Sequence, residues 1–220
     1  VLPYWSQADA GYASLLGMYA FGLEECNEYA RAEATGRQAV DLQPRDAWAI
    51  HAVAHVCEME GRLDDGVRWL EERREDWSRE NMLAVHNAWH LALYHLERGD
   101  TDRVLQMYDR AVRGTPSEVV LDLIDASALL WRLKLRGVDA GAERWSEIAG
   151  CWRKLAADRL YAFNDVHAMM AFVGAGDEDT AEALQHELVL ASKEEGSNGE
   201  MGREVGLPLC TALRAFGQGD

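Results

Sequence analysis

The sequence predicts an all-α protein built from stacked helical hairpins. Glycines recur at spacings of 38, 38, 39 and 43 residues, each at the end of an apolar, helix-like stretch. Most of them are followed by polar or charged residues that can begin another helix. A repeat of this length, with helices on both sides of each glycine, is typical of an α-helical solenoid in which each hairpin packs on its neighbours. The glycines are Gly61, Gly99, Gly137, Gly176 and Gly219.

Five hairpins are expected to follow one another along the chain. The first covers about residues 12–41, after which Pro44 stops a helix and Asp46 is a good N-cap for the next one. The four others are predicted at 47–60 with 63–77, 81–98 with 101–113, 118–136 with 142–157, and 165–175 with 178–195.

The segment 195–200 is expected to be flexible, because it holds two glycines and no apolar residue. A last helix, predicted at 203–216, has no partner in the sequence. An amphipathic helix without a partner exposes an apolar face. We therefore expect residues 1–220 to be one helical repeat domain of a longer protein, or a chain that covers this face by forming a homodimer.

Charge and cysteine content narrow the class of protein. The formal net charge is −16, which argues against nucleic acid or an anionic membrane surface as the main partner. Neither a long apolar run nor a signal peptide is visible. The cysteines Cys26, Cys57, Cys151 and Cys210 lie far apart and form no CxxC pair, so a reducing cytoplasm is the expected location.

Six of the seven histidines lie on the predicted first helices of hairpins. His51 and His55 are four residues apart, as are His86 and His90, so each pair shares one helix face. Measured from the glycine that ends each helix, the positions of His51, His86, His90 and His167 are near the same end of neighbouring first helices. First helices of such solenoids line a concave surface, so we predict a histidine-rich patch there.

Three interpretations of this patch remain open. The imidazoles could make buried hydrogen bonds between helices. They could instead bind a peptide or a small polar ligand, together with neighbouring tryptophan, asparagine and aspartate side chains. The third interpretation is a site for a divalent metal or for catalysis, because two HxxxH pairs can each chelate a transition metal.

The candidate residues follow from these interpretations. The ligand surface would consist of His51, His55, His86, His90, His167, Trp48, Trp89, Asn87, Asn164 and Asp165. The metal ligands would be His51, His55, His86 and His90, with Glu58 or Asp165 completing the shell.

Catalytic motifs are absent from the sequence. The HExxH pattern that adds a general base does not occur, because Ala52 follows His51 and Asn87 follows His86. No GxGxxG, GxxxxGK[ST] or GxSxG segment is present either. Most of the eight tryptophans are expected in the core, whereas Trp48 and Trp89 lie beside the histidine patch.

The first hairpin resembles a tetratricopeptide repeat. Counting back from Pro44, the signature positions of that repeat hold Leu16, Tyr19, Ala20, Leu23, Ala32 and Ala39, while Gly36 replaces the usual aromatic residue. Longer segments resemble the tetratricopeptide repeat protein 38 family, namely DAWAIHAVAHVCEMEGRLDDGVRWL, NMLAVHNAWHLALYHLERGD, NDVHAMMAFVGAGD and EVGLPLCTALRAFGQGD. The resemblance implies a helical repeat protein with further hairpins, and it implies no particular activity.

Taken together, these patterns predict a right-handed α–α superhelix of the tetratricopeptide type, with five hairpins and an unpaired C-terminal helix. We expect a non-enzymatic scaffold that holds a peptide or protein partner on its concave, histidine- and tryptophan-lined face. The alternative is an enzyme or small-molecule binder that uses the same histidines, with a divalent metal.

Overall fold

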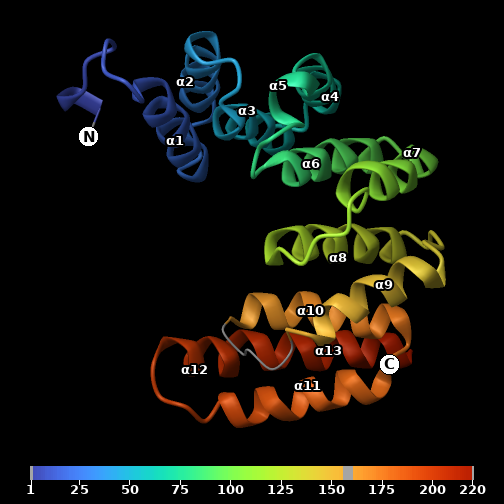
Figure 1. The fold of residues 1–220 in the computed structure, drawn as a ribbon. Helices are drawn as coiled ribbons and strands as arrows, with labels where there is room; N and C mark the ends of the chain where they lie inside the picture. Colours follow the sequence, from blue (N-terminus) through green and yellow to red (C-terminus); the bar gives the residue numbers. More distant parts are fainter. Residues whose placement is uncertain (1, 156–160, 220) are drawn as a thin grey trace. The chain divides into compact units, whose positions relative to one another are not determined.

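The chain is all-helical in the computed structural model, which describes residues 2–155 and 161–219 (Figure 1). No β-strand occurs in these residues, so the predicted all-α class is confirmed, whereas the right-handed superhelix stays a prediction. The chain divides into two compact units, residues 1–107 and 108–220. Whether the two units join into one continuous superhelical repeat domain stays a prediction.

The first unit contains two complete hairpins and most of a third. Its helices are α1 (Tyr12–Glu25), α2 (Tyr29–Leu42), α3 (Ala47–Met59), α4 (Leu63–Glu72), α5 (Arg74–Trp77), α6 (Ala84–Glu97) and α7 (Thr101–Met107), after a short 3₁₀ turn at Leu2–Tyr4. Helices α1 and α2 pack on each other and on α3, and α4 packs on α3 and α6. Successive hairpins therefore share one core within this unit.

The second unit contains two further hairpins and a C-terminal helix. It begins with a π-helical turn, η2 (Tyr108–Val112), and continues with α8 (Val120–Leu135), α9 (Ala142–Arg153), α10 (Ala162–Ala175), α11 (Glu178–Ala191), α12 (Ser197–Met201), η3 (Gly202–Gly206) and α13 (Leu207–Gln218). Helix α10 packs on α8, α9 and α11. All five predicted hairpins are therefore found in the described residues, whereas residues 156–157, the predicted end of the fourth, lie outside them.

The recurring glycines end the first helices as the sequence predicted. Gly61, Gly99, Gly137 and Gly176 all have positive φ, between 68° and 80°, a region that glycine enters without the cost that a Cβ imposes. After Gly61, the Arg62 amide donates to the Cys57 carbonyl at 2.8 Å, which is the 6→1 hydrogen bond of a Schellman C-cap.

The first hairpin uses an asparagine at the same place. Asn27 has φ 62°, and the following Glu28 amide donates to the Leu23 carbonyl at 2.8 Å. Asparagine is the residue that most often replaces glycine in this conformation. The α1–α2 turn is therefore the structural equivalent of the turn at Gly61, although the glycine pattern does not include it.

Small residues allow α1, α2 and α3 to approach closely. Ala20 and Ala32 are completely buried. A Cβ added at Gly36 would lie only 2.7 Å from Cγ2 of Val53, so no larger side chain fits there without a shift. The residue that departs from the tetratricopeptide pattern is thus required by the packing of this hairpin on the next.

Three segments differ from the sequence prediction. The predicted helix 63–77 is interrupted at Arg73 between α4 and α5, and the helix predicted at 101–113 changes to a π-helical turn after Met107. The segment predicted as flexible, 195–200, already begins α12 at Ser197. The first two are changes of helix geometry and the third is a short helix, and apolar periodicity does not locate such features.

The C-terminal helix is packed on one side and exposed on another. Helix α13 packs on α10 and α11, so it is not isolated from the preceding hairpin. No helix follows it in the described residues, and Leu209 and Phe216 are 46% and 49% exposed. The expected exposed apolar face is therefore present, whereas the homodimer that could cover it stays a prediction.

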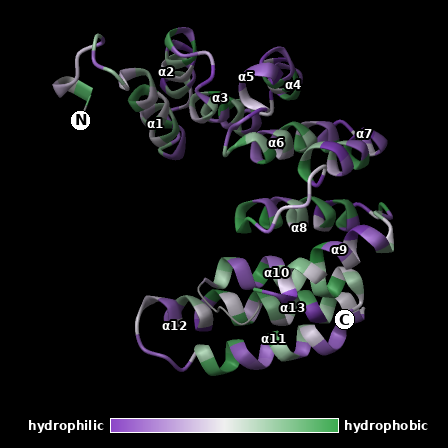
Figure 2. Ribbon diagram, viewed as in Figure 1, coloured by the Kyte–Doolittle hydropathy of each residue, from purple (hydrophilic) through white to green (hydrophobic). Residues whose placement is uncertain are grey.

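The distribution of hydrophobic residues fits this packing. Figure 2 shows that the helices carry both hydrophobic and hydrophilic residues along their lengths, as helices with one buried side do. Trp69, Trp77, Trp131, Trp145 and Trp152 are all buried, as predicted for core tryptophans. Among residues 2–155 and 161–219, no helix combines the length and the low polarity needed to cross a bilayer.

We expect Gly66→Ala to destabilise the first unit by about 1–3 kcal/mol, the usual cost of overpacking a core. A Cβ at Gly66 would lie 2.2 Å from the Tyr94 ring, which is buried and fixed by its hydroxyl donating to the Ala54 carbonyl. Gly22→Ala is the matched control, because nothing lies within 4 Å of a Cβ there and a helical alanine should add about 0.5–1 kcal/mol. Urea unfolding of both variants tests the prediction, and equal effects would contradict it.

Candidate metal centre

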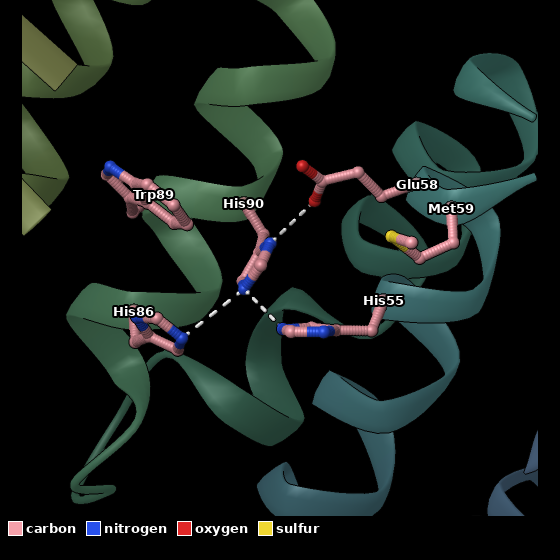
Figure 3. A pocket seen from close by; sticks show the side chains of 6 residues that line it. All are labelled: His55, Glu58, Met59, His86, Trp89 and His90. Atoms are coloured by element: carbon pink, nitrogen blue, oxygen red, sulfur yellow. Dashed lines mark hydrogen bonds and ion pairs between the residues drawn. The ribbon is translucent and has the colours of Figure 1, made fainter. Parts of the chain in front are cut away.

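Four imidazoles from two successive hairpins converge in the first unit. His51 and His55 extend from α3, and His86 and His90 extend from α6. The Nε2 atom of His90 lies 3.2 Å from Nε2 of His51, 3.1 Å from Nε2 of His55 and 3.3 Å from Nε2 of His86. One nitrogen from each of the four rings lies within 4.8 Å of those from the other three. Figure 3 shows His90 between His55 and His86.

Hydrogen bonds from side chains to backbone groups fix the two helices that carry these rings. The Asp46 carboxylate caps α3 by accepting from the amides of Trp48 and Ala49 at 3.1 and 3.0 Å. The Asn87 side chain on α6 donates to the Ala47 carbonyl at the start of α3, and the Tyr94 hydroxyl donates to the Ala54 carbonyl further along. These bonds hold the two HxxxH pairs beside each other on α3 and α6.

Two carboxylates contact the outer nitrogens of the rings. Glu58 Oε2 lies 2.9 Å from Nδ1 of His90, on the other side of the ring from the converging Nε2 atoms (Figure 3). Glu24 Oε2, at the end of α1, lies 3.4 Å from Nδ1 of His55. Histidines that bind metals commonly have such a carboxylate on the outer nitrogen, where it fixes the ring and makes the inner nitrogen more basic.

The contact with Glu58 determines the protonation of His90. A carboxylate oxygen accepts hydrogen bonds, so His90 donates from Nδ1, and its neutral ring has a lone pair on Nε2. That lone pair lies in one direction in the ring plane and can accept one good hydrogen bond. Three other Nε2 atoms lie within 3.3 Å of it. At most one of these three contacts can be a hydrogen bond.

Burial disfavours protonation of His51 and His55 near neutral pH. His51 and His90 are each only 3% exposed. Burial, followed by the charges of the neighbouring histidines, lowers the pKa of His51 far below its ordinary value. Burial also lowers the pKa of His55, to about 4. A proton shared between two of these rings is therefore a poor explanation for the close contacts between their nitrogens.

The three separations from His90 are close to those between the ligands of a tetrahedral metal site. Zinc binds histidine nitrogens at about 2.0–2.1 Å, and four ligands at tetrahedral angles then lie about 3.3–3.4 Å apart. The three Nε2 distances from His90 are 3.1, 3.2 and 3.3 Å. The neutral imidazole is also the ligand type that zinc, copper, nickel and iron share.

Aromatic side chains pack against His51, and a cavity lies beside the other three histidines. The centroid of the Phe21 ring lies 5.4 Å from that of the His51 ring, and the centroid of the Trp48 ring lies 5.5 Å from it. The cavity has a volume of about 280 Å³. The residues that line it are His55, Glu58, Met59, His86, Trp89 and His90.

Two sequence predictions about this site need correction. Asn87 was expected on a ligand-binding surface, but it is completely buried and donates to the Ala47 carbonyl, because it joins α6 to α3. Glu58 was expected to complete a metal shell, but it contacts the outer nitrogen of His90 and not the point where the Nε2 atoms meet. The two tryptophans differ from each other. Trp48 packs against His51, whereas Trp89 lines the cavity and stacks on His86 with 5.5 Å between the ring centroids.

The other predicted site residues lie in the second unit, on α10. His167 is buried and donates from Nδ1 to the Phe163 carbonyl at 2.7 Å, and burial lowers its pKa. Asp165 is buried and Asn164 is half-buried on the same helix. A shared surface of these three residues with the four-histidine cluster stays a prediction.

Glu24 is the member of the site that sequence reasoning missed. It lies three residues before Asn27, and Glu58 lies three residues before Gly61, so the two carboxylates occupy equivalent positions in successive hairpins. Each contacts a histidine on the first helix of the next hairpin. The signal would have been visible if Asn27 had been aligned with the repeating glycines.

A separate group, Glu24, Glu25 and His55, also brings one ligand atom from each residue within 4.8 Å of the others.

No protein-family model matches the chain, and no solved structure matches it. The resemblance to the tetratricopeptide repeat protein 38 family, the peptide or protein partner and the cytoplasmic location therefore stay predictions. What the candidate site does has to be argued from its geometry.

Proposed function

We propose that the first unit binds one divalent transition-metal ion, of which zinc fits best, through Nε2 of His51, His55, His86 and His90. The supporting observation is the approach of three Nε2 atoms to the Nε2 lone pair of His90 within 3.3 Å. One hydrogen bond accounts for one of these contacts. A cation at the centre makes all of them favourable, because every lone pair then points at a positive charge.

The carboxylates support the same assignment. Glu58 holds the proton of His90 on Nδ1, and Glu24 lies where it can do the same for His55. Both rings then present a lone pair to the ion. The two negative charges also offset part of the charge of a divalent ion in a buried place.

A metal bound in this way would join two successive hairpins. Two ligands come from α3 and two from α6, so the ion would link helices that are otherwise joined by side-chain packing and a few hydrogen bonds. Four protein ligands are typical of zinc sites that stabilise a fold. The proposed role is thus a metal cross-link inside a helical repeat protein.

The direct test is the metal content of the untagged protein, measured by inductively coupled plasma mass spectrometry after dialysis against zinc and then against metal-free buffer. The proposal expects close to one zinc ion per chain. A tag-free protein is essential, because a polyhistidine tag would supply its own ligands. Zinc well below one equivalent after such loading would overturn the proposal.

We expect Glu58→Gln to weaken zinc binding by about 10–100-fold, the usual effect of removing a partner of a ligating histidine. The glutamine amide can still accept from His90, but it lacks the negative charge that makes Nε2 a stronger ligand. Glu60→Gln is the control, because Glu60 is exposed and pairs with Arg62 instead. Competition with a chromophoric chelator gives both affinities, and unchanged affinity in Glu58→Gln would show that the carboxylate does not act on the metal.

A further inference from the structure

The cavity beside the histidines leaves one side of the proposed metal position accessible. His55, His86 and His90 line it, whereas His51 does not and packs against Phe21 and Trp48. His51 is 3% exposed, while His55 and His86 are half-buried. Of the four histidines, His55, His86 and His90 are therefore within reach of a molecule in the cavity, and Figure 3 shows these three side chains around it.

This arrangement allows a fifth ligand. Zinc with four ligands can expand to five. A donor atom in the cavity would approach the metal from the side on which His55, His86 and His90 lie. The ion would then have five ligands, and no histidine would have to leave.

The lining of the cavity indicates what kind of molecule would bring that donor. Its volume of about 280 Å³ is at the lower limit for ligand pockets, so the molecule is small. Met59 and the Trp89 indole provide apolar wall. The Glu58 carboxylate, also in the wall, disfavours an anion and favours a neutral molecule that carries an N–H group.

We propose that this cavity binds a small, neutral nitrogen-donor ligand, such as an imidazole-type ring, which coordinates the metal from the side of the cavity. This inference rests on the proposed function, since it needs the metal. It makes the centre a ligand-binding site in addition to a cross-link between hairpins. No bond is broken, because the ligand adds its lone pair to the ion.

The test uses cobalt in place of zinc and imidazole as the probe. Four-coordinate cobalt(II) absorbs visible light strongly, and its absorption weakens when a fifth ligand adds. The untagged protein is loaded with cobalt, its spectrum is recorded, and imidazole is added in steps, followed by a parallel titration with azide. We expect a saturable loss of absorption with imidazole at lower concentration than with azide, while cobalt stays bound.

Two variants locate the effect in the cavity. Met59→Trp should fill the cavity and weaken imidazole binding at least tenfold without changing the cobalt content, because Met59 is 58% exposed and its replacement disturbs little packing. Met82→Trp is the control, since Met82 is 81% exposed and does not line the cavity. Equal imidazole affinity in the two variants would overturn the assignment to this cavity.

The outcomes separate this inference from the proposed function. Stoichiometric cobalt whose spectrum imidazole does not change would mean a closed site, so the inference would be wrong and the metal cross-link would stand. Azide binding more tightly than imidazole would overturn the assignment to a neutral ligand. Loss of cobalt from the protein on imidazole addition would also count against it, and failure to load cobalt or zinc would remove both proposals.

Discussion

His90→Ala should abolish zinc binding, whereas His95→Ala, five residues further along the same helix, should leave it intact. His90 is the ring whose Nε2 lies within 3.3 Å of the three others, and its removal leaves three ligands without their common neighbour. His95 lies away from the cluster, where its Nδ1 is 3.2 Å from Asp100. The loss should therefore exceed the 10–100-fold effect expected for a partner outside the ligand set.

The measurement is zinc per chain, together with affinity by chelator competition. Circular dichroism in excess chelator shows whether each variant remains helical without metal. If His90→Ala unfolds because it leaves a space in the core, His86→Ala provides the same test at a half-buried position. One zinc ion bound with unchanged affinity in both variants would mean that these histidines are not the ligands.

The helical hairpins could be predicted because the first helix of each is followed by a residue with positive φ. Glycine is the usual choice, so the spacing of Gly61, Gly99, Gly137 and Gly176 located four turns. Asn27 performs the same role without being a glycine, and the pattern therefore missed the equivalence of the first turn. The break at Arg73 has no comparable residue signature, since helix geometry there changes within a run of charged residues.

The candidate site could be predicted only in part, for a physical reason. Spacing of four residues places His51 with His55 and His86 with His90 on common faces. It does not say that the two faces meet, because that depends on the packing of α3 against α6 through residues such as Asn87. The contribution of Glu24 depends in addition on how α1 lies beside α3, which no local pattern encodes.

Zinc should raise the free energy of unfolding, and a chelator should remove that gain. An ion that binds the folded chain alone stabilises it by about 4 kcal/mol when free zinc is 1,000 times the dissociation constant. Urea unfolding followed by circular dichroism, with zinc or with chelator, measures the difference. His90→Ala is the control, because a variant without the site should respond to neither. A chelator that leaves the native protein unchanged would contradict a stabilising role for the ion.

The dependence on zinc concentration also reports how many ions bind. For one ion, stability should rise by about 1.4 kcal/mol for each tenfold increase in free zinc above the dissociation constant. Glu24, Glu25 and His55 form a second group that could hold an ion, and joint occupation would double the slope. We expect the single slope. His55 can bind the first ion through Nε2 only while its proton is on Nδ1, next to Glu24. A second ion held by Glu24, Glu25 and His55 would take the place of that proton.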